Sequence, residues 1–500
     1  MKIAGLDIGS SGCKCTVLDA NGAILGRAYR DYPVRRQLSG HEVDISVVME
    51  AVFAVLKEMA SEHPDIGGIG VTSFGETFAM TGDDGEPMYP GILYTDPRGQ
   101  DAIRAVSEEM GERQIAAVTG LRPHSMDSLS RLHWMREHHP EICRKAKHIF
   151  LMEDYVIWHL TGKARIDYSL ATRTMAFDIR SMTWSEPILK WVGVDPALLS
   201  EPVPTGTPAG TLTPAAARAV GLSERTLVVC GAHDQVAACV GAGAFEGSVA
   251  VDGAGTTACL TPVFDGMPNI DVMFDGYYSV VPYAVPGKYV AYAFTHTGGA
   301  LVQWFVDTLA GREKDQAARE GTSVNALLED QYRRAHGDAP SGLMVLPHFA
   351  GTGTPWMDND ATGVFVGMNL STTAADLYRG CMEGVAYEML LNQRHLKGSG
   401  AHYERLHATG GGARSAVWMQ MKADVLNKPM TALKTVDAGT VGSAMLTGVA
   451  LGVFADLNDA AAHMVKEIAT YQPREDAHEA YMKVYERYEK LYGAIRSTRE

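Results

Sequence analysis

Short apolar runs that end in glycine, hydroxyl or acidic residues recur along the chain and predict strands that enter tight turns. Residues 3–8 form the first such run, whose one charged residue is Asp7, and lead into Gly9-Ser10-Ser11. Residues 14–18 form the returning run, and the Asp-Ala-Asn-Gly sequence at 19–22 predicts the next turn. The chain therefore begins with a predicted strand hairpin whose tip carries hydroxyl groups.

The same outline returns half a chain later. Residues 249–263 predict a strand, the turn Gly255-Thr256-Thr257 and a second strand. Gly9 and Gly255 lie 246 residues apart in a chain of 500, so the repeat predicts two halves of common ancestry, 1–245 and 246–500. Glycine lets a backbone approach a phosphate closely, and turn N–H groups with neighbouring hydroxyls bind it. Two such turns facing each other would hold a triphosphate between the halves.

Two common glycine motifs for nucleotides are not supported. Residues 253–258 formally fit the G-x-G-x-x-A dinucleotide pattern, but that pattern needs a helix to follow, and residues 259–263 predict a strand. No G-x-x-x-x-G-K-[ST] sequence occurs in the chain, so a P-loop is excluded. The glycine turns are therefore predicted to bind phosphate without either of these two motifs.

A third glycine cluster, Gly410-Gly411-Gly412, lies between a predicted strand at 405–408 and a predicted helix at 416–427 that ends before Pro429. A flexible linker is the alternative reading of such a cluster. Linkers are rarely wedged between a strand and a helix, however, and a surface without side chains could accept an adenine or ribose face. This cluster is therefore a candidate nucleotide contact.

Composition narrows the classes of function. With 500 residues, 46% of them hydrophobic, the chain can form two large halves with sizeable cores. The formal charge of −15 repels polyanions and argues against a nucleic-acid or anionic-membrane surface. The acid at position 7 and the lack of an 18-residue apolar run predict a cytoplasmic protein without a signal peptide. Seven cysteines without a Cys-x-x-Cys pair argue against a disulfide framework and the common zinc sites.

The order Asp7-x-Gly9, Gly255-Thr256-Thr257, Gly410-Gly411-Gly412 resembles that of the FGGY family of carbohydrate kinases, from the first strand to the last helix. Tyr94-Thr95-Asp96-Pro97-Arg98 is similar to the family's sugar-pocket strand Trp-x-Asp-x-Arg. Residues 126–135 and 363–384 resemble its two signatures. The chain departs from the family pattern at five positions: Gly75, Tyr94, Arg131, Gly353 and, in the second signature, Gly380.

The resemblance implies an α/β fold of two actin-like (ribonuclease H-like) domains around a deep cleft. Residues 1–245 would bind the sugar and carry the first phosphate hairpin and the catalytic aspartate, and residues 246–500 would bind ATP. Closure of the two domains would exclude water, so that hydrolysis does not compete with transfer. The expected substrates are ATP with Mg²⁺ and a small sugar or polyol.

Asp234 is the candidate general base. Residues 228–231 predict an apolar strand that ends in a glycine turn, and a predicted helix at 236–240 follows, so Asp234 would project from the top of the sheet. Its place resembles that of the family's catalytic aspartate, although an aspartate before a helix is also a common N-cap. Asp7 corresponds to a carboxylate near the phosphate-bound Mg²⁺, reached through water; an aspartate in a tight turn is the equal alternative.

The acceptor residues are predicted from the first half. Glu76-Thr77 matches the Arg-Glu-Thr segment of glycerol kinases, with Gly75 in place of the arginine, where xylulose kinases usually show Gln-Met-His. Asp96 and Arg98 belong to the same wall in the resemblance, but two such residues on one strand are equally explained as a surface ion pair. Asp234 and Gln235 complete the predicted acceptor site.

The predicted nucleotide contacts combine the three glycine clusters with two further residues. They are Gly9, Ser10, Ser11, Gly255, Thr256, Thr257, Gly298, Gly410, Gly411, Gly412 and Ser415. Elsewhere, Tyr481, Tyr485, Tyr488 and Tyr492 form a stripe on the last predicted helix, which favours docking against the body over the alternative of a homodimer contact.

The expected activity is phosphorylation of a pentulose such as D-xylulose. Glycerol, erythritol, L-fuculose, ribulose and gluconate remain open as acceptors, because a few pocket contacts decide which hydroxyl pattern is accepted. Two alternatives from other classes are an actin-like ATPase and a degenerate ATP-binding scaffold, the latter suggested by the departures from the family pattern. The sugar-wall match and Asp234 argue against the ATPase, and the intact phosphate turns together with Asp234 argue against the degenerate scaffold.

Overall fold

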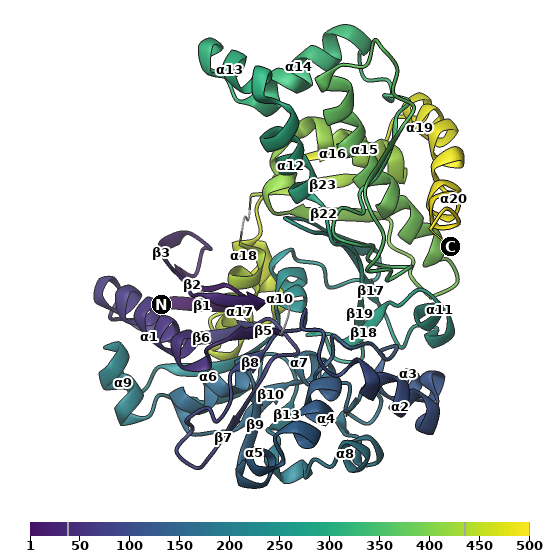
Figure 1. Cartoon of the computed structure of the whole chain (residues 1–500). Helices are drawn as coiled ribbons and strands as arrows, with labels where there is room; N and C mark the ends of the chain where they lie inside the picture. The colour runs from purple at the N-terminus through teal and green to yellow at the C-terminus, as the bar shows by residue number, and fades with distance from the viewer. Residues whose placement is uncertain (38–39, 435–436, 500) are drawn as a thin grey trace.

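The computed structural model describes residues 1–37, 40–434 and 437–499 and contains two α/β halves, each built on one large mixed sheet (Figure 1). The first sheet has six strands. Across the sheet they are β14 (Pro208–Thr211), β15 (Leu227–His233), β6 (Ile66–Ser73), β1 (Lys2–Ile8), β2 (Gly12–Leu18) and β3 (Ile24–Asp31).

The second sheet has seven strands. Across the sheet they are β18 (Ser279–Pro282), β19 (Tyr289–Thr295), β17 (Ala258–Phe264), β16 (Val249–Ala254), β22 (Arg405–Thr409), β23 (Met430–Leu433) and β24 (Glu467–Tyr471). The order β3-β2-β1-β6-β15 in the first sheet matches β19-β17-β16-β22-β23 in the second. In both, a three-strand antiparallel meander continues into two parallel strands, which confirms the predicted internal repeat.

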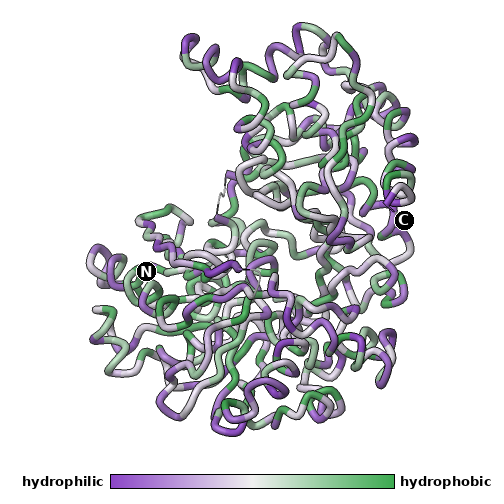
Figure 2. Tube along the Cα trace, in the orientation of Figure 1, coloured by the Kyte–Doolittle hydropathy of each residue, from purple (hydrophilic) through white to green (hydrophobic). Residues whose placement is uncertain are grey.

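Helices cover the faces of both sheets. The first half includes α1 (Ile45–Glu62), α2 (Gln100–Met110), α3 (Glu112–Thr119), α4 (Ser128–His138), α6 (Met152–Thr161), α7 (Tyr168–Thr172) and α9 (Pro214–Val220). The second includes α12 (Gly299–Leu309), α13 (Gly311–Glu320), α14 (Val324–His336), α15 (Ala374–His395), α16 (Ala416–Leu426), α18 (Leu457–Met464), α19 (Glu475–Tyr488) and α20 (Leu491–Arg496). Hydrophobic stretches run through the middle of each half, whereas the peripheral α13 is largely hydrophilic (Figure 2).

Two helices lie between the halves: α10 (Asp234–Gly241), which follows β15, and α17 (Ala438–Ala450), which follows β23 (Figure 1). The apolar side chains of α10 share a buried cluster with residues of β16, β17 and β19 in the second sheet. Helix α17 instead packs on β1 and β6 of the first sheet. The two halves therefore exchange helices: α10, which follows a strand of the first sheet, packs on the second sheet, and α17, which follows a strand of the second sheet, packs on the first.

The two exchanged helices cross at glycines. A Cβ atom on Gly442 would lie 1.9 Å from the carbonyl oxygen of Ala237, and one on Gly241 would lie 2.0 Å from that of Ala438. Gly5 of β1 meets α17 in the same way, because its Cβ would lie 1.9 Å from the carbonyl oxygen of Thr440. Backbones approach this closely only where a side chain is absent.

Several predicted elements are confirmed and one is wrong. The helix predicted at 416–427 is α16, which ends at Leu426, with Asn427 as its C-cap, before Pro429. Residues 94–98 form turns after the short strand β8 (Gly91–Ile92), not the predicted strand. Pro97 has no N–H for a strand ladder, and the Asp96 carboxylate accepts a 2.8 Å hydrogen bond from the Arg98 N–H, which favours a turn.

The tyrosine stripe docks on the body of the chain, as predicted. It continues from α19 into α20, and all four rings are buried. The Tyr488 hydroxyl donates to Glu388 at 2.6 Å, and the Tyr481 hydroxyl accepts a bond from Arg379. None of the helices in the described ranges combines the length and apolar character that a membrane crossing requires.

The helix crossing predicts a large effect of one methyl group. We expect Gly442→Ala to force α17 away from α10 and to lower the melting temperature by about 1–6 °C, since overpacking costs about 1–3 kcal/mol and the unfolding entropy of a chain this long is large. Gly493→Ala on the exposed part of α20, where no atom lies within 4 Å of the new Cβ, is the matched control and should leave the melting temperature unchanged or slightly raised. Equal melting temperatures for Gly442→Ala and the wild type would contradict the close crossing.

Candidate active site

The first hairpin brings a carboxylate and an ammonium together across two strands. The Gly9 N–H donates to the carbonyl of Gly12 at 2.9 Å and closes the turn between β1 and β2. The register of these strands pairs Asp7 with Lys14, and Lys14 Nζ lies 3.1 Å from Asp7 Oδ2. Burial raises the pKa of Asp7 above its ordinary value, and the neighbouring Lys14 opposes the rise.

Lys14 also reaches the second half of the chain. Its Nζ lies 3.3 Å from Oδ1 of Asp437, which directly precedes α17. The first turn of α17 also lies close to Asp7, because a Cβ atom on Gly439 would lie 3.3 Å from Asp7 Oδ2. The hairpin of the first half and the start of α17 therefore form one wall.

Asp234 opens α10 at the end of β15. The N-cap is His233, so Asp234 is the first helical residue and not an N-cap, which was the alternative reading of its position. Its side chain is 34% exposed, and its Oδ1 lies 3.3 Å from Nε2 of His233. Burial raises the pKa of Asp234 to about 6, while hydrogen bonds from Gln235 and the charges of Arg173 and Lys14 limit the rise. A carboxylate with this pKa is ionised at neutral pH and can accept a proton.

A cavity of about 270 Å³ joins these groups to the second glycine turn. It is lined by Asp7, Lys14, Asp234, Gln235, Ala238, Gly253, Gly255, Thr257, Cys259, Thr409, Gly410, Asp437, Ala438 and Gly439. The cavity brings together three carboxylates, one ammonium, the predicted phosphate turn at Gly255 and the predicted nucleotide contact Gly410. Gly9, Ser10 and Ser11 line neither this cavity nor the larger one next to it.

The larger cavity has a volume of about 1120 Å³ and lies in the second half. It shares Gly255 and Gly410 with the smaller one, so the two adjoin. Its remaining walls include the predicted Thr256, Gly411, Gly412 and Ser415, together with side chains of α12, α14, α15 and α16. An elongated ligand with a flat apolar end and a charged end would fit across the two cavities.

Hydrogen bonds from the start of α12 hold the second turn in place. The N–H groups of Gly298 and Ala300 donate to the carbonyl of Thr256 at 2.8 and 3.1 Å, and the Gly299 N–H donates to Gly255 at 2.9 Å. Gly298 therefore stabilises the second turn through its backbone N–H. Ser415 caps α16, accepting from the Trp418 N–H at 3.1 Å, and donates to Glu329 at 2.9 Å.

The predicted acceptor residues occupy different layers of the first half. The hydroxyl of Thr77 is buried and donates to the carbonyl of Ile92 at 3.1 Å. Both oxygens of Asp96 are also engaged, with Arg98 Nε at 2.8 Å and Nη2 at 2.6 Å. Arg98 reaches Glu42 as well, at 3.0 Å. These groups brace the wall, whereas Glu76 belongs to a different network.

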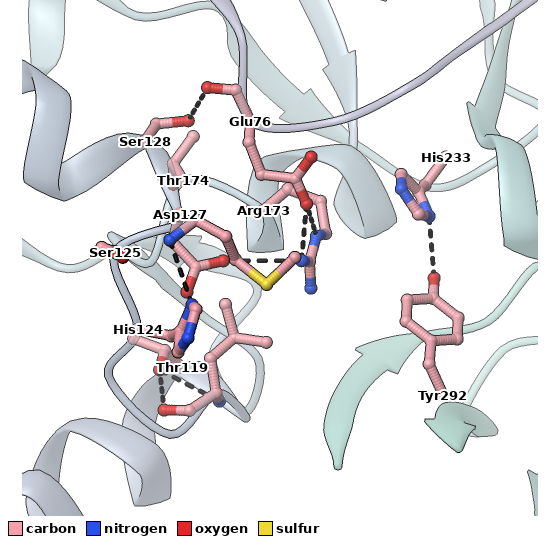
Figure 3. A network of polar contacts seen from close by, with 12 residues as sticks. Glu76, Thr119, His124, Ser125, Asp127, Ser128, Arg173, Thr174, His233 and Tyr292 are labelled. Carbon is pink, nitrogen blue, oxygen red and sulfur yellow. Dashed lines mark hydrogen bonds and ion pairs between the residues drawn. The ribbon is translucent and has the colours of Figure 1, made fainter. Parts of the chain in front are cut away.

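Glu76 pairs with an arginine that the sequence analysis did not identify (Figure 3). Arg173, which follows α7, donates to Glu76 Oε1 through Nε at 2.6 Å, and its Nη2 lies 2.5 Å from the same oxygen. Nη2 also lies 3.5 Å from Asp127. Burial raises the pKa of Asp127 to about 7, and Arg173 limits the rise. Nearby, His233 Nδ1 and the Tyr292 hydroxyl are hydrogen-bonded at 3.0 Å.

Two of the departures from the expected pattern have a steric reason. A Cβ on Gly353 would lie 2.0 Å from the carbonyl oxygen of Phe294, and one on Gly75 would lie 2.9 Å from Arg173 Cγ. A larger residue fits at neither position. Arg131 is buried and braces the loop before α4 by donating to the carbonyls of Ser125, at 2.7 Å, and Met126.

Three residues of the site, Lys14, Asp437 and Arg173, were not predicted from the sequence, and only Lys14 has a local signal there. Lys14 could have been found, because the predicted hairpin register places it opposite Asp7. Asp437 and Arg173 carried no local signal, because both reach the site from segments far away in the chain.

Comparison with known proteins supports one family. The profile described as "FGGY family of carbohydrate kinases, N-terminal domain" matches residues 2–241, and the corresponding C-terminal domain profile matches residues 254–451. The gluconokinase of Bacillus subtilis (strain 168) is 27% identical over 486 residues, which cover 95% of this chain and 93% of that protein. The xylulose kinase of the same organism is 23% identical over 495 residues, covering 98% and 96%.

The fold agrees with a solved structure over nearly its whole length. The crystal structure of gluconate kinase from Lactobacillus acidophilus matches with a TM-score of 0.89 at 22% identity and covers 99% of this chain and 98% of its own. The two-domain, actin-like α/β fold predicted from the sequence is thereby confirmed. Matching profiles at both halves, together with the glycine turns and carboxylates around the paired cavities, lead to one conclusion: the chain belongs to the FGGY family of carbohydrate kinases.

Proposed function

We propose that the chain transfers the γ-phosphoryl group of ATP to a hydroxyl of a small neutral sugar or polyol, with Asp234 as general base. The observation that carries this proposal is the 270 Å³ cavity, which Asp234 shares with the turn residues Gly255 and Thr257. The base takes the acceptor's hydroxyl proton as the new oxygen–phosphorus bond forms and the bond from Pγ to ADP breaks. Membership of a carbohydrate kinase family argues against an actin-like ATPase.

We assign the nucleotide to the second half and the acceptor to the first, within the division 1–245 and 246–500. The 1120 Å³ cavity suits the adenosine, with Gly410 to Gly412 against it and Ser415 beyond. The turn Gly255-Thr256-Thr257 would bind the phosphates through its N–H and hydroxyl groups. Gly9-Ser10-Ser11 would approach them from the first half as the domains close.

The carboxylates suit a magnesium ion that retains water ligands. Asp7, Asp234 and Asp437 supply hard oxygen atoms around one cavity, and Lys14 already pairs with two of them. Among the described residues no three His, Cys, Asp or Glu side chains form a direct metal cluster. Mg²⁺ on ATP would neutralise phosphate charge during transfer. Asp7 would orient its water shell, and Lys14 would hold Asp7 in place.

The acceptor wall favours a neutral molecule. The acidic groups Glu76 and Asp127 lie beside Arg173, and the proposed base Asp234 follows them at the site, so an acidic substrate would add a negative charge among carboxyl groups. We therefore place D-xylulose or another pentulose first. The Glu76-Thr77 match supports a glycerol- or erythritol-type polyol as the second candidate, and the similarity to gluconokinase keeps gluconate as the third.

An acceptor panel tests the proposed reaction. ADP release should depend on an added acceptor and should be most efficient, in kcat/KM, with a pentulose among D-xylulose, ribulose, L-fuculose, glycerol, erythritol and gluconate. The coupled assay measures release with each acceptor and with none. Equal release without acceptor would contradict a kinase, and ATP binding without transfer to any acceptor would revive the degenerate scaffold.

Replacing the base should stop chemistry and spare binding. We expect Asp234→Asn to lower kcat about 100- to 10,000-fold, because the amide cannot accept the hydroxyl proton. ATP affinity, measured by calorimetry, and the melting temperature should stay close to those of the wild type. Asp101→Asn, at a carboxylate that is 95% exposed on α2, is the matched control. Normal turnover by purified Asp234→Asn would rule out the assignment.

The raised pKa of Asp234 predicts the acid limb of the pH profile. A general base works only when ionised, so kcat/KM for the acceptor should fall as the pH drops through about 6. An ordinary aspartate would instead lose activity near pH 4. Because the charge of Lys14 lowers the pKa of Asp234, Lys14→Met should move the limb to higher pH. A wild-type profile that stays flat down to pH 4.5 would contradict the role of Asp234.

A further inference from the structure

Arg173 is buried beside the acceptor wall with one hydrogen-bond donor unused. Nε and Nη2 of its guanidinium both contact the same oxygen, Oε1 of Glu76, and only 3% of the residue is exposed. Nη1 is buried and has no hydrogen-bond partner among the described residues. A buried donor without a partner costs free energy, so such groups in native structures usually await a ligand or water.

Glu76 offers an acceptor next to that donor. Its two contacts with Arg173 end on Oε1, and no hydrogen bond to Oε2 occurs in the described ranges (Figure 3). The Glu76 backbone has a φ of +69°, an uncommon conformation for a residue with a side chain. Strained conformations of this kind persist at ligand sites when the surroundings hold them. Here the buried ion pair with Arg173 holds the carboxylate.

The guanidinium comes from a different segment than the family resemblance implies. In glycerol kinases the arginine precedes the glutamate directly, whereas this chain has Gly75 there. A Cβ on Gly75 would lie 2.9 Å from Arg173 Cγ and 3.2 Å from His233 Cδ2. The side chain of Arg173 therefore fills the space that a residue at 75 would need.

A short series of contacts connects this donor to the proposed base. The Arg173 guanidinium carbon lies 6.0 Å from the centre of the Tyr292 ring. The Tyr292 hydroxyl is bonded to His233, whose Nε2 lies 3.3 Å from Asp234. Burial raises the pKa of Asp234 and the charge of Arg173 limits that rise, so the two groups lie near each other at the site.

We propose that Arg173 is a specificity-determining residue that binds the acceptor through Nη1, while Glu76 Oε2 accepts a hydrogen bond from the neighbouring hydroxyl. This pairing selects a neutral compound with a carbonyl or hydroxyl oxygen next to a second hydroxyl. A carboxylate at the same place would lie beside the acidic groups Glu76 and Asp127, with which Arg173 is already paired. The inference rests on the proposed function and deepens it.

The first test replaces Arg173 by lysine, which keeps the positive charge beside Glu76 but lacks the second N–H fork. With the best neutral acceptor of the panel, we expect Arg173→Lys to lower kcat/KM about 10- to 100-fold, mainly through a higher acceptor KM, since a hydrogen bond from a charged group is lost. The KM for ATP should stay within about threefold, because Arg173 lies outside both cavities assigned to the nucleotide. An acceptor KM unchanged in Arg173→Lys would overturn the inference.

The second test moves the guanidinium back to position 75. Arg173→Ala removes Cγ, the atom that a Cβ at position 75 would approach to 2.9 Å, and keeps Cβ, which that atom would approach to 3.1 Å. Gly75→Arg combined with Arg173→Ala then tests whether an arginine next to Glu76 can replace Arg173. We expect the double variant to recover at least tenfold in acceptor kcat/KM over Arg173→Ala alone. A purely structural Arg173 would lower the melting temperature without changing the acceptor KM, which would contradict a contact with substrate. If Arg173→Ala does not fold, Arg173→Lys decides the question.

The wild-type panel separates this inference from the proposed function. A wild type without acceptor-dependent ADP release refutes the function itself. A wild type that turns over neutral acceptors, together with an unchanged Arg173→Lys, refutes only the role of Arg173. A wild type that prefers gluconate to every neutral acceptor refutes the neutral class.

Discussion

The packing of α10 against α17 is the contact on which the site depends. Because Gly241 and Gly442 carry no Cβ, each helix reaches the backbone carbonyls of the other, and each covers the sheet of the opposite half. Helix α10 begins with Asp234, and α17 begins directly after Asp437, so the crossing carries both carboxylates to Asp7. Helix N-termini also favour anions, which suits a site for transferred phosphate.

Charge balance explains why one carboxylate can act as a base. Lys14 lies between Asp7 and Asp437, and Arg173 lies between Glu76 and Asp127, so four acidic groups have a cation at hand. Buried charges without such partners cost several kcal/mol. Asp234 shares these cations only at longer range, and its burial is not fully compensated. The incomplete compensation gives it the proton affinity that a general base needs near neutral pH.

Local sequence was sufficient for much of the fold. The hairpins at Gly9 and Gly255, the strand that leads to Asp234 and the helix after Gly412 were all predicted, because apolar periodicity and turn residues act over a few positions. The strand that the family resemblance implied at Asp96 is instead a turn, because the Asp96 side chain is hydrogen-bonded to the backbone of Arg98. A motif match does not reveal such a bond.

The sequence by itself determined that two related halves each contain a strand hairpin with a glycine and hydroxyl turn, since short, local patterns specify that repeat. Only the tertiary structure decided which groups meet between them. Lys14 reaches Asp437 across 423 residues, and Arg173 reaches Glu76 across 97. Such pairs form because burial of both sheets fixes the segments side by side, and desolvation then requires each charge to find a partner. No spacing in the sequence encodes that requirement.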